Sequence, residues 1–156
     1  MKASVGSLLS AVLLGSFVAG MAPASAQTPT VYKGTLAFTL WINTVTAVPS
    51  GGELICSATA IVADVVASPT PSTTEHSETA STPATVSSPS SAYCVVSIPY
   101  QWTLLNGGSD SVTLSYSVTM VSGSGATSRT TSAQIGSVGV PTGNSTTSLG
   151  PYSVRL

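Results

Sequence analysis

Residues 93–105 form the stretch that most constrains the fold, because their side chains change character at every residue. Successive side chains of a β-strand point to opposite faces of the sheet. One face of this stretch would be apolar and aromatic, with Cys94, Val96, Ile98, Tyr100, Trp102 and Leu104. The other face would be mostly polar, so the pattern predicts a half-buried strand. Pro99 cannot donate a ladder hydrogen bond, which predicts that the strand lies at a sheet edge or carries a bulge.

Other stretches repeat the two-residue period, and clusters of Gly, Pro and Ser separate them. They cover residues 35–43, 53–66, 111–121, 129–140, 145–149 and 152–156. The turn at Asn106, Gly107 and Gly108 is typical of a hairpin that would pair residues 111–121 with residues 93–105. No stretch of ten residues after position 26 has helical spacing. We therefore expect an all-β protein, an antiparallel β-sandwich with immunoglobulin-like topology as the commonest fold of this class.

Residues 67–92 differ from the rest of the chain in composition. They are almost entirely Ser, Thr, Pro and Ala, with Glu75, His76 and Glu78 at their centre. Such a segment has no apolar periodicity and buries too little surface to offset the entropy lost on ordering. It is predicted to be a disordered, low-complexity loop that is dispensable for folding.

The first 26 residues have the pattern of a signal peptide. Lys2 supplies a positive charge, residues 8–19 an apolar core, and Ala24, Ser25 and Ala26 a cleavage site of small residues. We expect cleavage after Ala26 and a single domain over residues 27–156. No later segment could cross a bilayer as a helix, so no membrane insertion is expected after cleavage. The predicted destination is outside the cytoplasm: secreted, periplasmic or at the cell surface.

Cys56 and Cys94 are the only two cysteines of the chain. An exported chain meets an oxidising environment, which favours a disulfide between them. Closing that loop would contribute about 4 kcal/mol in the chain-entropy model. Neither cysteine has a histidine or another cysteine nearby in the sequence, so we expect no zinc site.

Charged residues are scarce, with Lys and Arg numbering 4 and Asp and Glu numbering 5. Nucleic-acid binding needs clustered Lys and Arg, and the chain has no such cluster. We therefore expect no nucleic-acid partner. Ser and Thr make up about a third of residues 27–156, far above ordinary usage. This bias is typical of extracellular, β-rich or fibre-forming proteins.

Catalytic residue types are few. His76 is the only histidine, and in a flexible loop nothing would hold it beside a serine nucleophile. Glu53, Asp64 and Asp110 could in principle supply the carboxylate pair of a glycosidase. Each stands beside a turn or at a strand end, where a solvated role is simpler. A metal ion held by His76 and its acidic neighbours would have to order the loop by itself. We expect no enzyme, no metal and no cofactor.

An alternating strand over residues 35–43 precedes Cys56 and Cys94, which lie about forty residues apart. This order and spacing resemble pilins of the chaperone–usher type, over the first two-thirds of residues 27–156. The resemblance implies a fibre subunit that is assembled by strand addition. The chain departs from the pilin pattern at its end, where Arg155 stands at the penultimate position that is typically aromatic in pilins.

Aromatic side chains are the remaining candidates for function. Trp41, Tyr32 and Tyr152 form a candidate contact surface for a partner protein or a sugar. Our leading hypothesis is an exported, non-enzymatic β-sandwich that acts as a structural or protein-interaction module at the cell surface or in the periplasm. Its partner would be an unknown protein or another copy of itself. The alternatives are a fimbrial or surface-fibre subunit and a carbohydrate-binding module.

Overall fold

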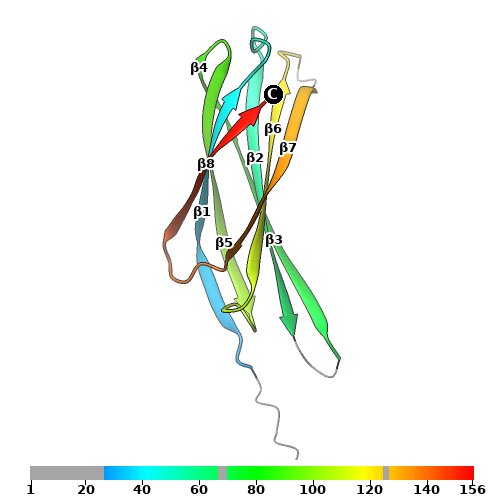
Figure 1. Cartoon of the computed structure of the whole chain (residues 1–156), viewed down its shortest axis with the longest axis vertical. Helices are drawn as coiled ribbons and strands as arrows, with labels where there is room; N and C mark the ends of the chain where they lie inside the picture. The colour runs from blue at the N-terminus through cyan, green and yellow to red at the C-terminus, as the bar shows by residue number, and fades with distance from the viewer. Residues whose placement is uncertain (1–26, 67–69, 125–126) are drawn as a thin grey trace, which may run out of the picture.

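The computed structural model describes residues 27–66, 70–124 and 127–156. Within these ranges the chain forms eight strands in two four-stranded sheets that pack against each other (Figure 1). The strands are β1 (Thr30–Asn43), β2 (Glu53–Val66), β3 (Ser72–Pro83), β4 (Thr85–Ser88), β5 (Ser91–Leu104), β6 (Ser111–Val121), β7 (Thr127–Gly139) and β8 (Thr146–Arg155). Sheet A has the order β4-β5-β1-β8 and sheet B the order β3-β2-β6-β7. The expected all-β sandwich is confirmed.

The strand order does not confirm the immunoglobulin-like topology. In an immunoglobulin constant domain the first two strands of the chain are neighbours in one sheet. Here β1 lies in sheet A between β5, which is antiparallel to it, and β8, which is parallel. β2 lies in sheet B between β3 and β6.

None of the described residues forms a helix that could cross a membrane. The expected signal peptide over residues 1–26 lies outside the described ranges. Cleavage after Ala26 therefore stays a prediction.

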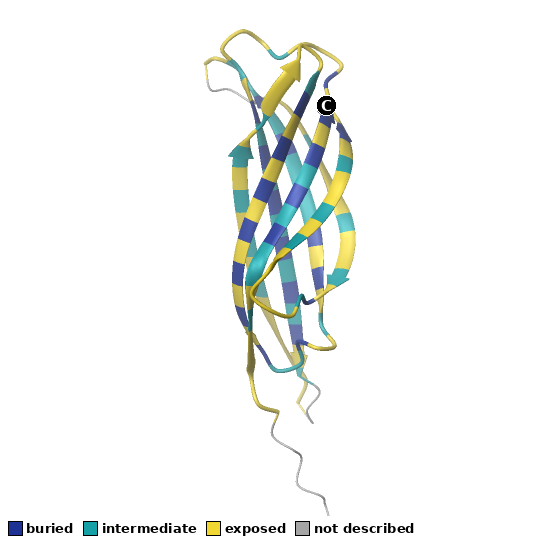
Figure 2. Cartoon of the chain, turned by 90° about the vertical axis from the view of Figure 1, so that its left-hand side faces the viewer, coloured by how far each residue is buried: buried dark blue, intermediate teal, exposed yellow. Residues whose placement is uncertain are grey.

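The core lies between the two sheets and consists of the inward side of each alternation. Along β5, residues from Ala92 to Leu104 alternate between buried and exposed, as expected for a half-buried strand. Figure 2 shows the same alternation along neighbouring strands. Tyr100 and Trp102 stack in this core with ring centroids 4.3 Å apart. Burial of each large apolar side chain contributes about 1.5–3 kcal/mol.

The edge position inferred from Pro99 is also confirmed. β4 pairs only with residues from Ser91 to Tyr93 of β5. Beyond Tyr93, the only described neighbour of β5 is β1, with Pro99 opposite Thr35. Pro99 therefore lies in the stretch of β5 that forms a free sheet edge, where a missing donor is tolerated.

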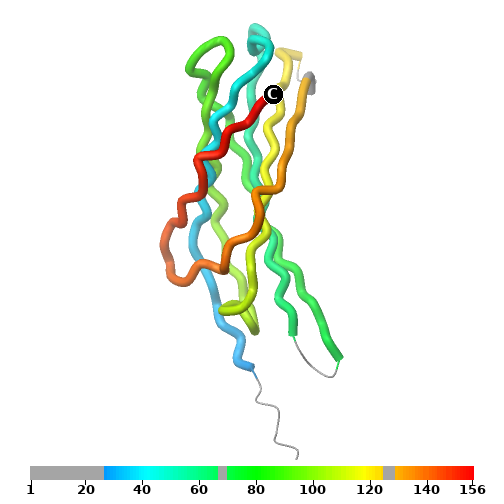
Figure 3. The backbone as a smooth tube through the Cα atoms, in the orientation of Figure 1, coloured from blue at the N-terminus to red at the C-terminus, as the bar shows by residue number. Residues whose placement is uncertain are grey.

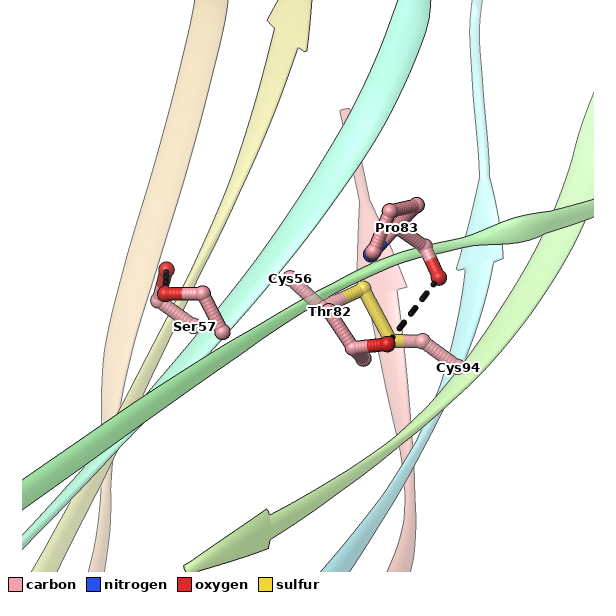
Figure 4. The surroundings of a disulfide bond; sticks show 6 residues. Cys56, Ser57, Thr82, Pro83 and Cys94 are labelled. Atoms are coloured by element: carbon pink, nitrogen blue, oxygen red, sulfur yellow. Dashed lines mark hydrogen bonds between the residues drawn. A yellow bond between two sulfur atoms is a disulfide. The ribbon is translucent and has the colours of Figure 1, made fainter.

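The predicted disulfide between Cys56 and Cys94 is present and joins the two sheets (Figure 4). Cys56 lies on β2 of sheet B and Cys94 on β5 of sheet A, with their Cα atoms 6.6 Å apart. Both residues are buried, so the bond is part of the core. It holds the sheets together beside the place where the chain passes from β3 to β4.

The prediction of a disordered loop over residues 67–92 is wrong for the described part of that segment. β3 pairs with β2 from Ser72 opposite Val66 to Pro83 opposite Ile55. The chain then changes sheet at Ala84, whose amide donates to the carbonyl of Leu54, and continues as β4 beside β5. The composition misled the prediction because an edge strand is held largely by backbone hydrogen bonds, which need no large apolar side chains. Thr-rich sequence also favours extended backbone.

The β3–β4 segment closes one side of the sandwich, while the opposite side stays more open. There β7 and β8 belong to different sheets and run apart along most of their length (Figure 3). Apolar residues next to this side are only partly buried against the core: Tyr116, Ile135, Leu149 and Tyr152. The disulfide and the crossing strand therefore stabilise the side away from β7 and β8.

The expected hairpin between residues 93–105 and 111–121 is wrong, although its turn exists. The amide of Ser109 donates to the carbonyl of Asn106 at 2.7 Å, as in a tight turn. β5 and β6, however, lie in different sheets, and β6 pairs with β2 and β7. Both strands have one apolar face, and those faces meet across the core instead of side by side in one sheet.

Candidate contact surface

Trp41 projects from the outer face of sheet A. It lies on β1 between two buried neighbours, Leu40 and Ile42, and half of its surface is exposed (50%). Tyr93 stands directly opposite on β5 and is also exposed. The two ring centroids are 5.6 Å apart, with the planes inclined by 39°. This distance and tilt lie in the range of favourable aromatic pairs.

Val95 extends this surface along β5 and is 49% exposed. We call Trp41, Tyr93 and Val95 the aromatic patch. The cross-strand row through its rings runs from Thr85 through Tyr93 and Trp41 to Ser153, so every position of that row is uncharged. A partner that covers the patch would not have to desolvate an ion in this row, which favours close contact.

Tyr32 and Tyr152, the other two predicted contact residues, do not join Trp41. Tyr32 is opposite Trp102 and Tyr152 is opposite Leu40, so both belong to the inward side of sheet A. Both are partly buried and pack against the core. Gly107 lies against the Tyr32 ring so closely that a Cβ at this position would collide with it. Tyr32 therefore covers one end of the sandwich.

Tyr93 is the surface residue that the sequence reasoning missed. Alternation along residues 93–105 does place it on the polar side, away from Cys94. Its pairing with Trp41 depends on the register between β1 and β5, which are separated by three other strands in the chain. The sequence therefore showed that Tyr93 is an aromatic residue out of phase with the core, but it did not show that Trp41 stands opposite it.

The outer face of sheet B is lined with hydroxyl groups. One cross-strand row consists only of serines: Ser81, Ser57, Ser117 and Ser132. Hydroxyls bond across strands, with Ser57 and Ser81 at 2.8 Å and Thr59 and Thr79 at 2.9 Å. A shallow hollow of about 380 Å³ lies over this area. The outer face of sheet B is therefore polar, in contrast to the aromatic patch.

Asp64 is a structural residue and not a solvated one as the sequence suggested. It is 4% exposed, and its carboxylate accepts the backbone amides of Leu105 and Asn106 at 2.8 and 3.1 Å. It thus fixes the turn that carries the chain from sheet A to sheet B. Charge-assisted hydrogen bonds to backbone amides are among the stronger ones in proteins.

Asp110 lies next to Asp64. Burial raises the pKa of Asp110, and the nearby Asp64 carboxylate raises it further. Its Oδ2 atom is buried without a donor from the described residues. Asp110 and Glu75 also help to line a surface hollow.

His76 and its acidic neighbours lie on β3 and not in a loop. Glu75 is opposite Ala63 and His76 opposite Val62, so the two side chains leave the strand on opposite faces. Among residues 27–66, 70–124 and 127–156, no group of three or more His, Cys, Asp and Glu side chains could hold a metal ion. Glu53 begins β2 and is exposed, far along that strand from Asp64.

Comparisons with protein-family models, curated proteins and solved structures gave no match to this chain.

Proposed function

We propose that this protein is an exported, non-enzymatic β-sandwich that works by binding a protein partner at the cell surface or in the periplasm. The observation that carries the proposal is the aromatic patch on sheet A, where Trp41 is half exposed beside Tyr93. Trp and Tyr are the residues most enriched among those that dominate binding energy at protein interfaces. A single exposed apolar residue needs no explanation, but two paired aromatics and Val95 together form a contiguous surface.

Export is supported by the leader pattern of residues 1–26 and by the disulfide. A disulfide that is buried in the core and links the sheets fits an oxidising compartment, where such bonds persist.

The proposal leaves out catalysis because the acidic residues have structural explanations. Asp64 accepts hydrogen bonds from the backbone of the turn after β5, and Asp110 lies beside it at the start of β6. The only histidine, His76, lies on the edge strand β3 with Val62 opposite it.

Binding of the purified protein to intact cells of its source would test the proposal. Trp41→Ala and Tyr93→Ala should each weaken saturable binding by about tenfold or more, since a central aromatic residue contributes about 2 kcal/mol or more at such interfaces. Val31→Ala is the matched control, because Val31 lies on the same face of β1 and is 55% exposed but stands ten residues from Trp41. Equal binding by wild type and Trp41→Ala would refute the proposal.

A carbohydrate-binding module is the second candidate, since exposed aromatic rings also stack on sugars. Treating the cells before the assay separates the two. Loss of binding after protease treatment supports a protein partner. Loss after periodate oxidation, with protease having no effect, would replace the protein partner with a glycan while keeping the same patch.

A further inference from the structure

The free edges of the two sheets differ in their protection against pairing with another strand. An edge strand presents unpaired N–H and C=O groups, and proteins block such edges with proline, charge, bulges or short length. Pro99 interrupts the free stretch of β5, and Pro151 together with a register shift interrupts β8. β3 carries Glu75 and Glu78, and β4 has only four residues.

The middle of β7 lacks this protection over six residues, although a register shift stands at each end of them. Within the described ranges its only neighbour is β6, so one whole edge is free. Residues 129–134 pair with β6 residue for residue, between one register shift just before Arg129 and another just beyond Gln134. This regular stretch contains no proline, and Arg129 at its start is its only charged residue. It is exposed throughout except at Thr131, which is partly buried.

We propose that β7 is a self-association site, at which the β7 strands of two copies pair in antiparallel fashion about a two-fold axis at Ser132. Pairing would join the two copies of sheet B into one continuous sheet. Each copy would supply the same edge, as a two-fold interface requires. The bonding groups are the backbone N–H and C=O groups that face away from β6.

The sequence of β7 favours a second copy as the occupant because it is complementary to itself. In this register Thr130 is opposite Gln134, Thr131 opposite Ala133 and Ser132 opposite Ser132. The two Arg129 side chains lie about 20 Å apart, at opposite ends of the paired stretch, so they do not repel each other strongly. A two-fold axis perpendicular to a sheet maps each face onto itself. The outer face of sheet B in one copy would therefore continue as the outer face of sheet B in the other.

Pairing at β7 would also cover apolar surface on the open side of the sandwich. Ala133 is exposed, and Ile135 is only partly buried against the core. The site lies on sheet B, whereas the aromatic patch lies on sheet A. Self-association is therefore separable from binding of the proposed partner.

Sedimentation equilibrium of the full exported chain, from micromolar to millimolar concentration, tests the inference. We expect the wild type to dimerise. Ser132→Lys and Ser132→Glu should each raise the dimer dissociation constant by roughly tenfold or more, because like charges would meet at the two-fold axis. An equimolar mixture of the two variants should restore dimerisation, because opposite charges then meet.

Ser81→Lys is the matched control, since Ser81 occupies the opposite end of the same serine row, on β3. It adds the same charge to sheet B and should leave the dissociation constant unchanged, as should Trp41→Ala on sheet A. Thermal unfolding confirms that each variant is folded. A wild type that stays monomeric over the whole range, or a dimer that Ser132→Lys and Ser132→Glu both leave intact, would overturn the inference. Hydrogen exchange adds an independent measurement: amides of residues 129–134 should become more protected as concentration rises.

Discussion

Removal of the disulfide is the perturbation whose effect can be worked out most fully from this fold. The double variant Cys56→Ala/Cys94→Ala leaves the backbone pairing of β3 with β2 and of β4 with β5 in place. The bond closes a segment of 38 residues. For a loop of that length the chain-entropy model gives about 4 kcal/mol, most of it acting through the unfolded chain. The two sulfur atoms are also buried, so their loss adds a smaller packing cost.

Domains typically have a free energy of unfolding of roughly 5–15 kcal/mol, so a loss of about 4 kcal/mol is a large part of it. The variant should still fold, with its melting temperature lowered by roughly 15 °C for a domain of this size. Equilibrium unfolding in guanidinium chloride, followed by tryptophan fluorescence, measures the change directly. Trp102 is buried and stacked on Tyr100, so its emission should report loss of the core.

Wild-type protein reduced with a thiol is the control, because it removes the covalent link while keeping both cysteine side chains. It should lose nearly as much stability as the double alanine variant. A loss below about 1 kcal/mol in both samples would contradict the argument that the bond restricts the unfolded chain.

Three further predictions follow from other parts of the fold. Replacing residues 72–88 with a Gly/Ser linker should lower the melting temperature strongly or prevent folding, because β2 would lose β3 and β5 would lose β4 as a paired neighbour. A shift of only a few degrees would mean that β3 and β4 contribute little. Trp102→Ala should cost about 3–5 kcal/mol in urea unfolding. Trp102→Phe should cost much less, since the buried indole N–H has no acceptor among the described residues. The raised pKa of Asp110 means that its folded form retains a proton more readily than its unfolded form, so stability should fall as pH rises from about 4 through that raised pKa. Asp110→Asn should remove this fall in unfolding free energies measured across pH, and an identical pH profile for both proteins would show that Asp110 is not responsible.

The candidate contact surface could be predicted only in part. Trp41 could be assigned to an outer face because it lies between Leu40 and Ile42 in an alternating run. Its partner Tyr93 could not, because the register of β1 against β5 depends on the whole sandwich. Tyr32 and Tyr152 were grouped with Trp41 by residue type, yet both occupy positions in phase with the core.

The amino-acid sequence by itself determined the local properties: which stretches outside residues 67–92 form strands, which side of each is apolar, and which two cysteines pair. These properties depend on the alternation of neighbouring residues and on there being only two cysteines. The tertiary structure alone decided that residues 72–88 are ordered, that the chain changes sheet after Asn106, and that β7 keeps a free edge. Those features depend on backbone hydrogen bonds between strands distant in sequence. Backbone groups are the same at almost every residue, so their pairing leaves little trace in the sequence.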